Sequence, residues 1–88
     1  MYYTYILHCK DGKLYTGFTP NLRVRFIRHT KGFVKSTKNR RPLKLIYYEA
    51  FLEKLDAKNR EKYLKGGKGK LEIEMILNNY FNKYSWVK

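Results

Sequence analysis

Apolar and polar residues in the first twenty positions follow a pattern that predicts a β-hairpin. Residues 2–8 are mostly β-branched, aromatic or aliphatic, which favours a strand. Residues 13–18 form a second run of the same kind. Between the two runs stands Lys10-Asp11-Gly12-Lys13, a typical turn sequence.

The length of that turn decides which side chains share a face of the sheet. A two-residue turn would put Tyr5 and Tyr15 on opposite faces, because strand side chains alternate. A three-residue loop with a left-handed Gly12 would pair Leu7 with Tyr15, and Tyr5 with Gly17. We favour the three-residue loop, which leaves both tyrosines on one face and open space opposite Tyr5.

A helix is predicted directly after the hairpin, with Thr19 as its N-cap and Pro20 at its first position. Gly32 is expected to end it. Leu22 and Phe26 are expected to face inward, with Val24 and Ile27 as further candidates. One exposed face is expected to carry or adjoin Arg25, Arg28 and His29.

The remainder of the chain alternates between polar and apolar segments. Residues 31–44 are expected to form a basic loop closed by Pro42, and residues 43–51 a further strand. Asp56 is the expected N-cap of a helix over 57–65 that Gly66-Gly67 stops. A last helix is predicted over 71–80, with an end at Tyr84 as the longer alternative. Its packing is assigned to Ile73, Met75, Ile76, Leu77, Tyr80 and Phe81.

Net charge narrows the choice of partner. The 88 residues, enough for one domain, hold 20 Lys and Arg against seven Asp and Glu, which gives +13. Such an imbalance favours a polyanion such as nucleic acid, and biased amino-acid usage is the alternative. No apolar run approaches a membrane span, and no basic amphipathic helix stands out. The lone Cys9 and the absence of a signal-peptide pattern favour the cytoplasm.

Several polar side chains are candidates for binding or chemistry. Glu61 shares a helical stripe with Ala57 and Leu64, which calls for a metal, an ion pair with a neighbouring lysine, or a stripe at the protein's edge. Phosphate contacts are assigned to Lys35, Lys38, Arg40 and Arg41, extended by Lys62, Lys65, Lys68 and Lys70, with a solvated surface as the alternative. His8 and Cys9 are expected to be structural. Stacking on bases is open to Tyr47, Tyr48 and Trp86, although core packing is favoured for the two tyrosines.

The motifs together resemble the GIY-YIG endonuclease family over nearly the whole chain, most closely its small single-domain bacterial members. Tyr3-Thr4-Tyr5 and Tyr15-Thr16-Gly17 stand where the two family triplets belong. Residues 19–25 resemble the helix start that carries the family's arginine, here Arg25, with His29 one turn later. Residues 56–65 resemble the helix that carries the metal-binding glutamate, here Glu61. Tyr3, Thr4 and Thr16 depart from the family pattern at structural positions.

This resemblance implies an α/β fold, a small, mainly antiparallel three-stranded sheet flanked by about three helices. It also implies metal-dependent cleavage of nucleic acid, DNA in preference to RNA, in repair or processing. The implied site has Tyr5 as base, its phenolate favoured by cations such as Arg25. Tyr15 would position water or phosphate, Arg25 would bind phosphate, and His29 would take a proton or orient a tyrosine. Glu61 would hold one Mg²⁺ or Mn²⁺, and Asn78 or Asn79 is a further candidate. A nucleic-acid-binding module without catalysis and a nuclease subunit that needs a protein partner remain open.

Overall fold

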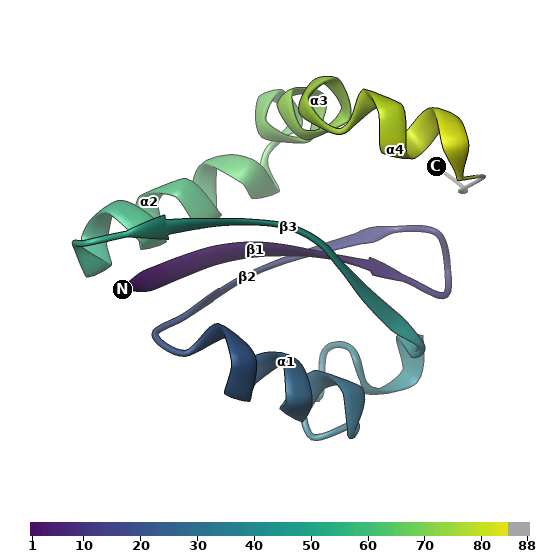
Figure 1. Cartoon of the computed structure of the whole chain (residues 1–88), viewed down its shortest axis with the longest axis horizontal. Helices are drawn as coiled ribbons and strands as arrows, with labels where there is room; N and C mark the ends of the chain where they lie inside the picture. The colour runs from purple at the N-terminus through teal and green to yellow at the C-terminus, as the bar shows by residue number, and fades with distance from the viewer. Residues whose placement is uncertain (85–88) are drawn as a thin grey trace.

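The structure, a computed structural model, describes residues 1–84, which form a three-stranded sheet with helices on both faces (Figure 1). The strands are β1 (Tyr2–Cys9), β2 (Leu14–Thr19) and β3 (Leu43–Phe51). The helices are α1 (Leu22–Thr30), α2 (Lys54–Lys65), α3 (Gly67–Ile76) and α4 (Asn78–Lys83), with a short 3₁₀ helix η1 (Lys38–Arg40). The predicted α/β class and antiparallel three-stranded sheet are confirmed, and the described residues form four α-helices where about three were expected.

The central strand is β1, which lies between β2 and β3 and is antiparallel to both. Its register with β2 pairs Leu7 with Tyr15 and Tyr5 with Gly17, so the prediction of the three-residue loop is confirmed. Gly12 has a φ of 83°, the left-handed conformation that such a loop requires and that glycine adopts without strain. Tyr5 and Tyr15 therefore share a face of the sheet.

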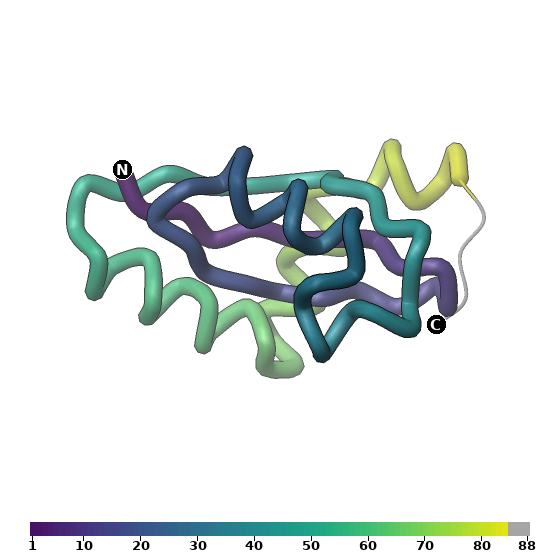
Figure 2. Tube along the Cα trace, turned by 90° about the horizontal axis from the view of Figure 1, so that it is seen from below, coloured from purple at the N-terminus to yellow at the C-terminus, as the bar shows by residue number. Residues whose placement is uncertain are grey.

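The two faces of β1 bury different kinds of side chain. On one face, Ile6 packs with Leu64 of α2 and Ile73 of α3 in an apolar core. On the other face, Tyr5 contacts α1, which covers this side of the sheet (Figures 1 and 2). Because side chains alternate along a strand, one central strand serves both an apolar core and a polar cluster. No helix within residues 1–84 is long and apolar enough to cross a membrane.

The first helix differs from its prediction at its start and on its faces. Asn21 is the N-cap, because its side chain accepts a hydrogen bond from the Val24 amide. Thr19 ends β2, and its hydroxyl instead accepts from the Asn21 amide. Val24 and Ile27 are about half exposed, whereas His29 is fully buried, so the predicted exposed position of His29 is wrong. His29 therefore lies on the side of α1 that faces the sheet, where its ring contacts Tyr5 of β1 and Tyr15 of β2.

The C-terminal helices also start and end differently from the prediction. α2 begins at Lys54, after an extended Glu53. Asp56 is therefore not the N-cap but lies in the first turn, where its negative charge interacts favourably with the positive end of the helix dipole. The predicted last helix is two helices that meet at Leu77. Met75 and Ile76, expected to pack, are 79% and 47% exposed. The break at Leu77 redirects the chain, so the apolar residues of this segment do not share one buried stripe.

Candidate active site

Three of the predicted site residues are joined by hydrogen bonds on the α1 face of the sheet. The Tyr5 hydroxyl on β1 lies 2.7 Å from Nε2 of His29 on α1. Nε of Arg25 donates to the same hydroxyl over 3.4 Å. Arg25 and His29 are one helical turn apart, so both reach Tyr5 from the same side. Tyr5 is 1% exposed and His29 is fully buried, whereas Arg25 is partly exposed.

Tyr15 on β2 completes this cluster. Its ring centroid lies 5.3 Å from that of His29 and 6.3 Å from that of Tyr5. Unlike Tyr5, it is partly exposed. Gly17, the cross-strand partner of Tyr5, leaves the space that the Tyr5 ring fills, since a methyl group on Gly17 would lie 2.8 Å from Cε1 of that ring and closer still to its hydroxyl. Tyr15 is thus the tyrosine of the cluster that is open to solvent.

Burial sets the protonation states of the buried pair. It raises the pKa of Tyr5 to about 12 and outweighs the opposing hydrogen bond from Arg25. Arg25 does favour the Tyr5 phenolate, as expected, but burial is the larger effect and the net shift of the Tyr5 pKa is upward. Burial, followed by the charge of Arg25, lowers the pKa of His29 to about 4. At neutral pH, His29 is a neutral imidazole with one nitrogen free to accept a proton.

Glu61, the predicted metal ligand, lies on α2. Its stripe-mates Ala57 and Leu64 are buried, whereas the Glu61 side chain is 23% exposed, so the stripe does run to the protein's edge. Oε2 of Glu61 pairs with Nζ of Lys65 at 3.1 Å, the ion pair that the sequence offered as an alternative. The negative charge of the carboxylate is also a minor cause of the raised pKa of Tyr5, after burial and Tyr15.

The donor set around Glu61 fits a divalent ion that is held mainly by water and substrate. Within residues 1–84, no three or more His, Cys, Asp and Glu side chains gather in a group that could hold a metal. Mg²⁺ commonly binds through one or two carboxylates while water and phosphate oxygens complete its shell. The partly exposed carboxylate of Glu61 can supply one such protein ligand. Glu61 is the residue that would hold the ion.

The predicted phosphate-binding residues fall into two groups. Arg40 pairs with Asp11 at 2.8 Å, and Arg41 donates to the backbone carbonyl oxygens of Lys38 and Thr30. These two guanidinium groups therefore serve the loop that follows α1. By contrast, five predicted lysines are exposed, namely Lys35, Lys38, Lys62, Lys68 and Lys70. Lys65 pairs with Glu61 and is exposed as well. The exposed lysines are the better placed to meet phosphates.

Other residues singled out in the sequence lie outside the cluster. His8 lies 2.6 Å from the Tyr80 hydroxyl, and Cys9 is buried, in keeping with structural roles. Asn78 and Asn79 are exposed at the start of α4, and their part in the site stays a prediction. Trp86 lies outside the described residues.

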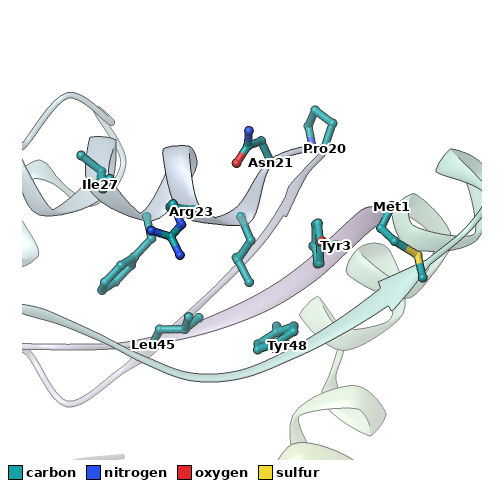
Figure 3. A pocket seen from close by; sticks show the side chains of 10 residues that line it. Met1, Tyr3, Pro20, Asn21, Arg23, Ile27, Leu45 and Tyr48 are labelled. Atoms are coloured by element: carbon teal, nitrogen blue, oxygen red, sulfur yellow. The ribbon is translucent and has the colours of Figure 1, made fainter.

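A groove of about 740 Å³ runs between α1 and the strands β1 and β3 (Figure 3). Tyr48, expected in the core, is 54% exposed there, beside Tyr3 and Arg23. The lining contains no His, Cys, Asp or Glu side chain and none of the five predicted catalytic residues. The groove is therefore a separate feature from the cluster of Tyr5, Tyr15, Arg25 and His29.

Sequence reasoning missed one member of the cluster, Thr37. Its hydroxyl lies 2.7 Å from Nδ1 of His29, and the residue is fully buried. The sequence shows Thr37 only as one polar residue in a basic loop, eight positions after His29, with no periodicity to mark it. The apolar pair Phe33-Val34 in this basic loop was the available sign that the loop turns inward, and Val34 is indeed buried.

Comparisons with known proteins identify the family to which the chain is similar. Residues 1–75 match the family model of the GIY-YIG catalytic domain. A UPF0213 protein of Clostridium perfringens is 39% identical over 89 aligned positions, which cover 100% of this chain and 96% of the relative. A UPF0213 protein of Staphylococcus haemolyticus is 42% identical over 76 aligned positions, which cover 85% of this chain and 93% of the relative. The solution NMR structure of a UPF0213 protein from Bacillus halodurans superposes with a TM-score of 0.56 at 35% identity, covering 86% of this chain and 85% of that one.

Proposed function

Since this chain belongs to the GIY-YIG family, whose catalytic domain implies nuclease activity and nucleic-acid binding in general, we propose that it is a metal-dependent endonuclease. We propose DNA as the preferred substrate, with a role in repair or processing in the cytoplasm. One observation supports this most directly. Tyr5, Arg25 and His29 form a hydrogen-bonded unit, with Tyr15 against it and the Glu61 carboxylate close enough to influence it.

The Tyr5–His29 pair would accept the proton of the attacking water. Tyr5 is a protonated phenol at neutral pH, because burial raises its pKa to about 12, so it can take a proton from water only if it passes its own proton on. The neutral His29 supplies the missing base. As the water oxygen attacks phosphorus, the Tyr5 oxygen receives a proton from water and its own proton moves to Nε2 of His29 over a bond of 2.7 Å. The P–O bond to the leaving oxygen then breaks, and that oxygen is protonated from solvent.

Tyr15 and Arg25 would align the substrate, because they are the partly exposed members of the cluster. A guanidinium group can hold two phosphate oxygens at once and stabilise the charge that develops on them. The Tyr15 hydroxyl would position the attacking water or a phosphate oxygen. Glu61 would hold Mg²⁺ or Mn²⁺, which supplies charge neutralisation at the leaving 3′ oxygen when bound. The exposed lysines Lys35, Lys38 and Lys62 would track the phosphate backbone without reading sequence.

A cleavage assay tests this function. Single-stranded, duplex, flapped and branched DNA and one structured RNA are incubated with Mg²⁺, Mn²⁺ or chelator. Glu61→Gln and Tyr5→Phe should each lower turnover at least about 100-fold, the scale of losing a group that acts on the transition state. Glu53→Gln is the matched control, since Glu53 is exposed at the start of α2 and its side chain makes no cap hydrogen bond.

The outcomes separate the candidate functions. Metal-dependent cutting that Glu61→Gln and Tyr5→Phe abolish, and Glu53→Gln leaves intact, would support the nuclease. Salt-sensitive binding without cutting would favour a binding module, and cutting only after a cell fraction is added would favour a partner-dependent subunit. Cutting that survives both site variants would refute the site assignment.

A further inference from the structure

We propose that Thr37 is a positioning residue that holds His29 in the tautomer with its proton on Nδ1, so that Nε2 faces Tyr5 as a proton acceptor. This inference deepens the proposed function and rests on it for its catalytic meaning. The tautomer itself is a property of the folded chain and can be measured without any substrate.

The first argument counts donors and acceptors around Tyr5. A phenol has one hydrogen to donate, and within residues 1–84 its hydroxyl has two hydrogen-bond partners, Arg25 and His29. A guanidinium group only donates. His29 is therefore the acceptor for the Tyr5 hydrogen, which requires an unprotonated Nε2. With the other tautomer, the buried hydroxyl would face two donors and its own hydrogen would lack an acceptor.

The second argument comes from the opposite side of the imidazole ring. The Thr37 hydroxyl lies 2.7 Å from Nδ1 of His29 and 3.5 Å from the carbonyl oxygen of Val34. A carbonyl oxygen only accepts, so it draws the Thr37 hydrogen toward itself and leaves the hydroxyl oxygen to accept from Nδ1–H. Both ends of the ring thus specify the same tautomer.

The loop after α1 fixes Thr37 in place. The amides of Thr37 and Lys38 both donate to the Val34 carbonyl oxygen, over 3.1 and 2.9 Å, and the Arg40 amide donates to the Thr37 carbonyl over 2.9 Å. Thr37 is fully buried, and the Val34 side chain is 93% buried. Backbone hydrogen bonds on both sides of Thr37 therefore fix the position from which its hydroxyl reaches His29.

The result is a hydrogen-bond chain with one direction. Arg25 donates to Tyr5, Tyr5 to His29, His29 to Thr37, and Thr37 to the Val34 carbonyl. When the Tyr5 O–H bond breaks and an Nε2–H bond forms, His29 becomes an imidazolium ion whose second N–H already has its acceptor. Thr37 changes no bond in this step; it orients the group that does.

Nitrogen-15 NMR of the full-length, metal-free chain at pH 7 reports the tautomer directly. Long-range imidazole correlations should show a protonated Nδ1 and an unprotonated Nε2 for His29, and His29→Gln assigns the signals, since the chain has two histidines. Thr37→Val, which keeps the shape and removes the hydroxyl, should shift His29 toward Nε2–H or a mixture. Thr37→Ser should restore the wild-type spectrum.

Thr30→Val is the matched control, because the Thr30 hydroxyl also donates to a backbone carbonyl in this region but is exposed. On a substrate that the wild type cleaves, Thr37→Val should lower turnover about 10- to 100-fold with KM unchanged, the range for partners that orient a reacting ligand. Thr37→Ser should recover most of it.

Two results would overturn the inference. One is a wild-type His29 that is protonated on Nε2, a measurement that needs no variant and so survives if Thr37→Val fails to fold. The other is a folded Thr37→Val chain with an unchanged tautomer. If no substrate is cleaved, the proposed function fails while the tautomer result still stands or falls by the spectrum.

Discussion

Gly17→Ala should disable the site through a single added methyl group. The new carbon would lie 2.8 Å from Cε1 of Tyr5 and closer still to Cζ and the hydroxyl oxygen. Carbon atoms in ordinary contact are about 3.5–4.0 Å apart, so the ring must retreat by about 1 Å. Tyr5 is 1% exposed and has no free space to move into without a rearrangement of its neighbours.

The expected effects follow from that displacement. A shift of about 1 Å breaks the 2.7 Å bond to His29 and leaves two buried polar groups poorly paired, at a cost of about 1–3 kcal/mol. Overpacking adds about 1–3 kcal/mol. Gly17 does not have a positive φ, so alanine brings no backbone strain. We expect a loss of about 3 kcal/mol of unfolding free energy, and a misplacement of this size should lower turnover about 100-fold.

Urea denaturation followed by circular dichroism measures the first quantity, and cleavage of the preferred substrate the second. Gly67→Ala is the control, because a methyl group there meets no atom within 4 Å, and it should be neutral or raise stability by up to about 1 kcal/mol. Gly17→Ala combined with Tyr5→Leu should lose less than the two single variants add up to, since the clash is with the ring. A Gly17→Ala chain within about 0.5 kcal/mol of wild type and fully active would refute the reasoning.

Three further predictions concern charge. Burial lowers the pKa of His29 from 6.5 to about 4, so between these pH values the unfolded chain binds the proton more readily than the folded chain. As the pH drops from 7 to 4, the unfolding free energy of the wild type should therefore fall by about 3 kcal/mol more than that of His29→Gln. Equal losses in denaturant titrations of the two chains would contradict this. Lys65→Ala removes the cation that pairs with Glu61, so Mn²⁺ affinity in a metal titration should rise about two- to five-fold, whereas unchanged or weaker affinity would argue against Glu61 as the ligand. Lys38→Ala should reduce the slope of log binding constant against log salt concentration for DNA by about 1. Arg41→Ala should chiefly lower the melting temperature, because the Arg41 guanidinium donates to two backbone carbonyl oxygens. The reverse pattern would exchange the roles of the two residues.

The local parts of the structure could be predicted because they depend on residues close in the chain. The hairpin follows from two strand-forming runs and a glycine that tolerates the left-handed conformation at the turn. The register of the hairpin places Tyr5 and Tyr15 on the same face of the sheet. A shift of one residue would place them on opposite faces, because side chains alternate along a strand. β3 spans residues 43–51 as expected, and α2 ends at Lys65, before Gly66-Gly67, as expected.

Burial, by contrast, depends on how the elements pack, and the predictions that relied on it failed. His29 looked like an exposed helix-end residue, yet it is fully buried because α1 turns that stripe toward β1. The same burial reverses the expected effect on Tyr5, whose pKa rises where neighbouring cations alone would lower it. In a helix of only nine residues, the spacing of apolar residues does not determine which side of the helix faces the sheet.

The sequence by itself determined the order of the three strands and of the first two α-helices, and the hairpin register, since these follow from local conformation and spacing. The residues of the candidate site came from the resemblance to the family. Only the tertiary structure decided that Thr37 reaches His29 and that Arg40 and Arg41 are occupied within the fold. Those contacts join segments that come together only when the loop after α1 packs inward. Hydrogen-bond direction and desolvation arise there from three-dimensional neighbours, which linear spacing does not encode.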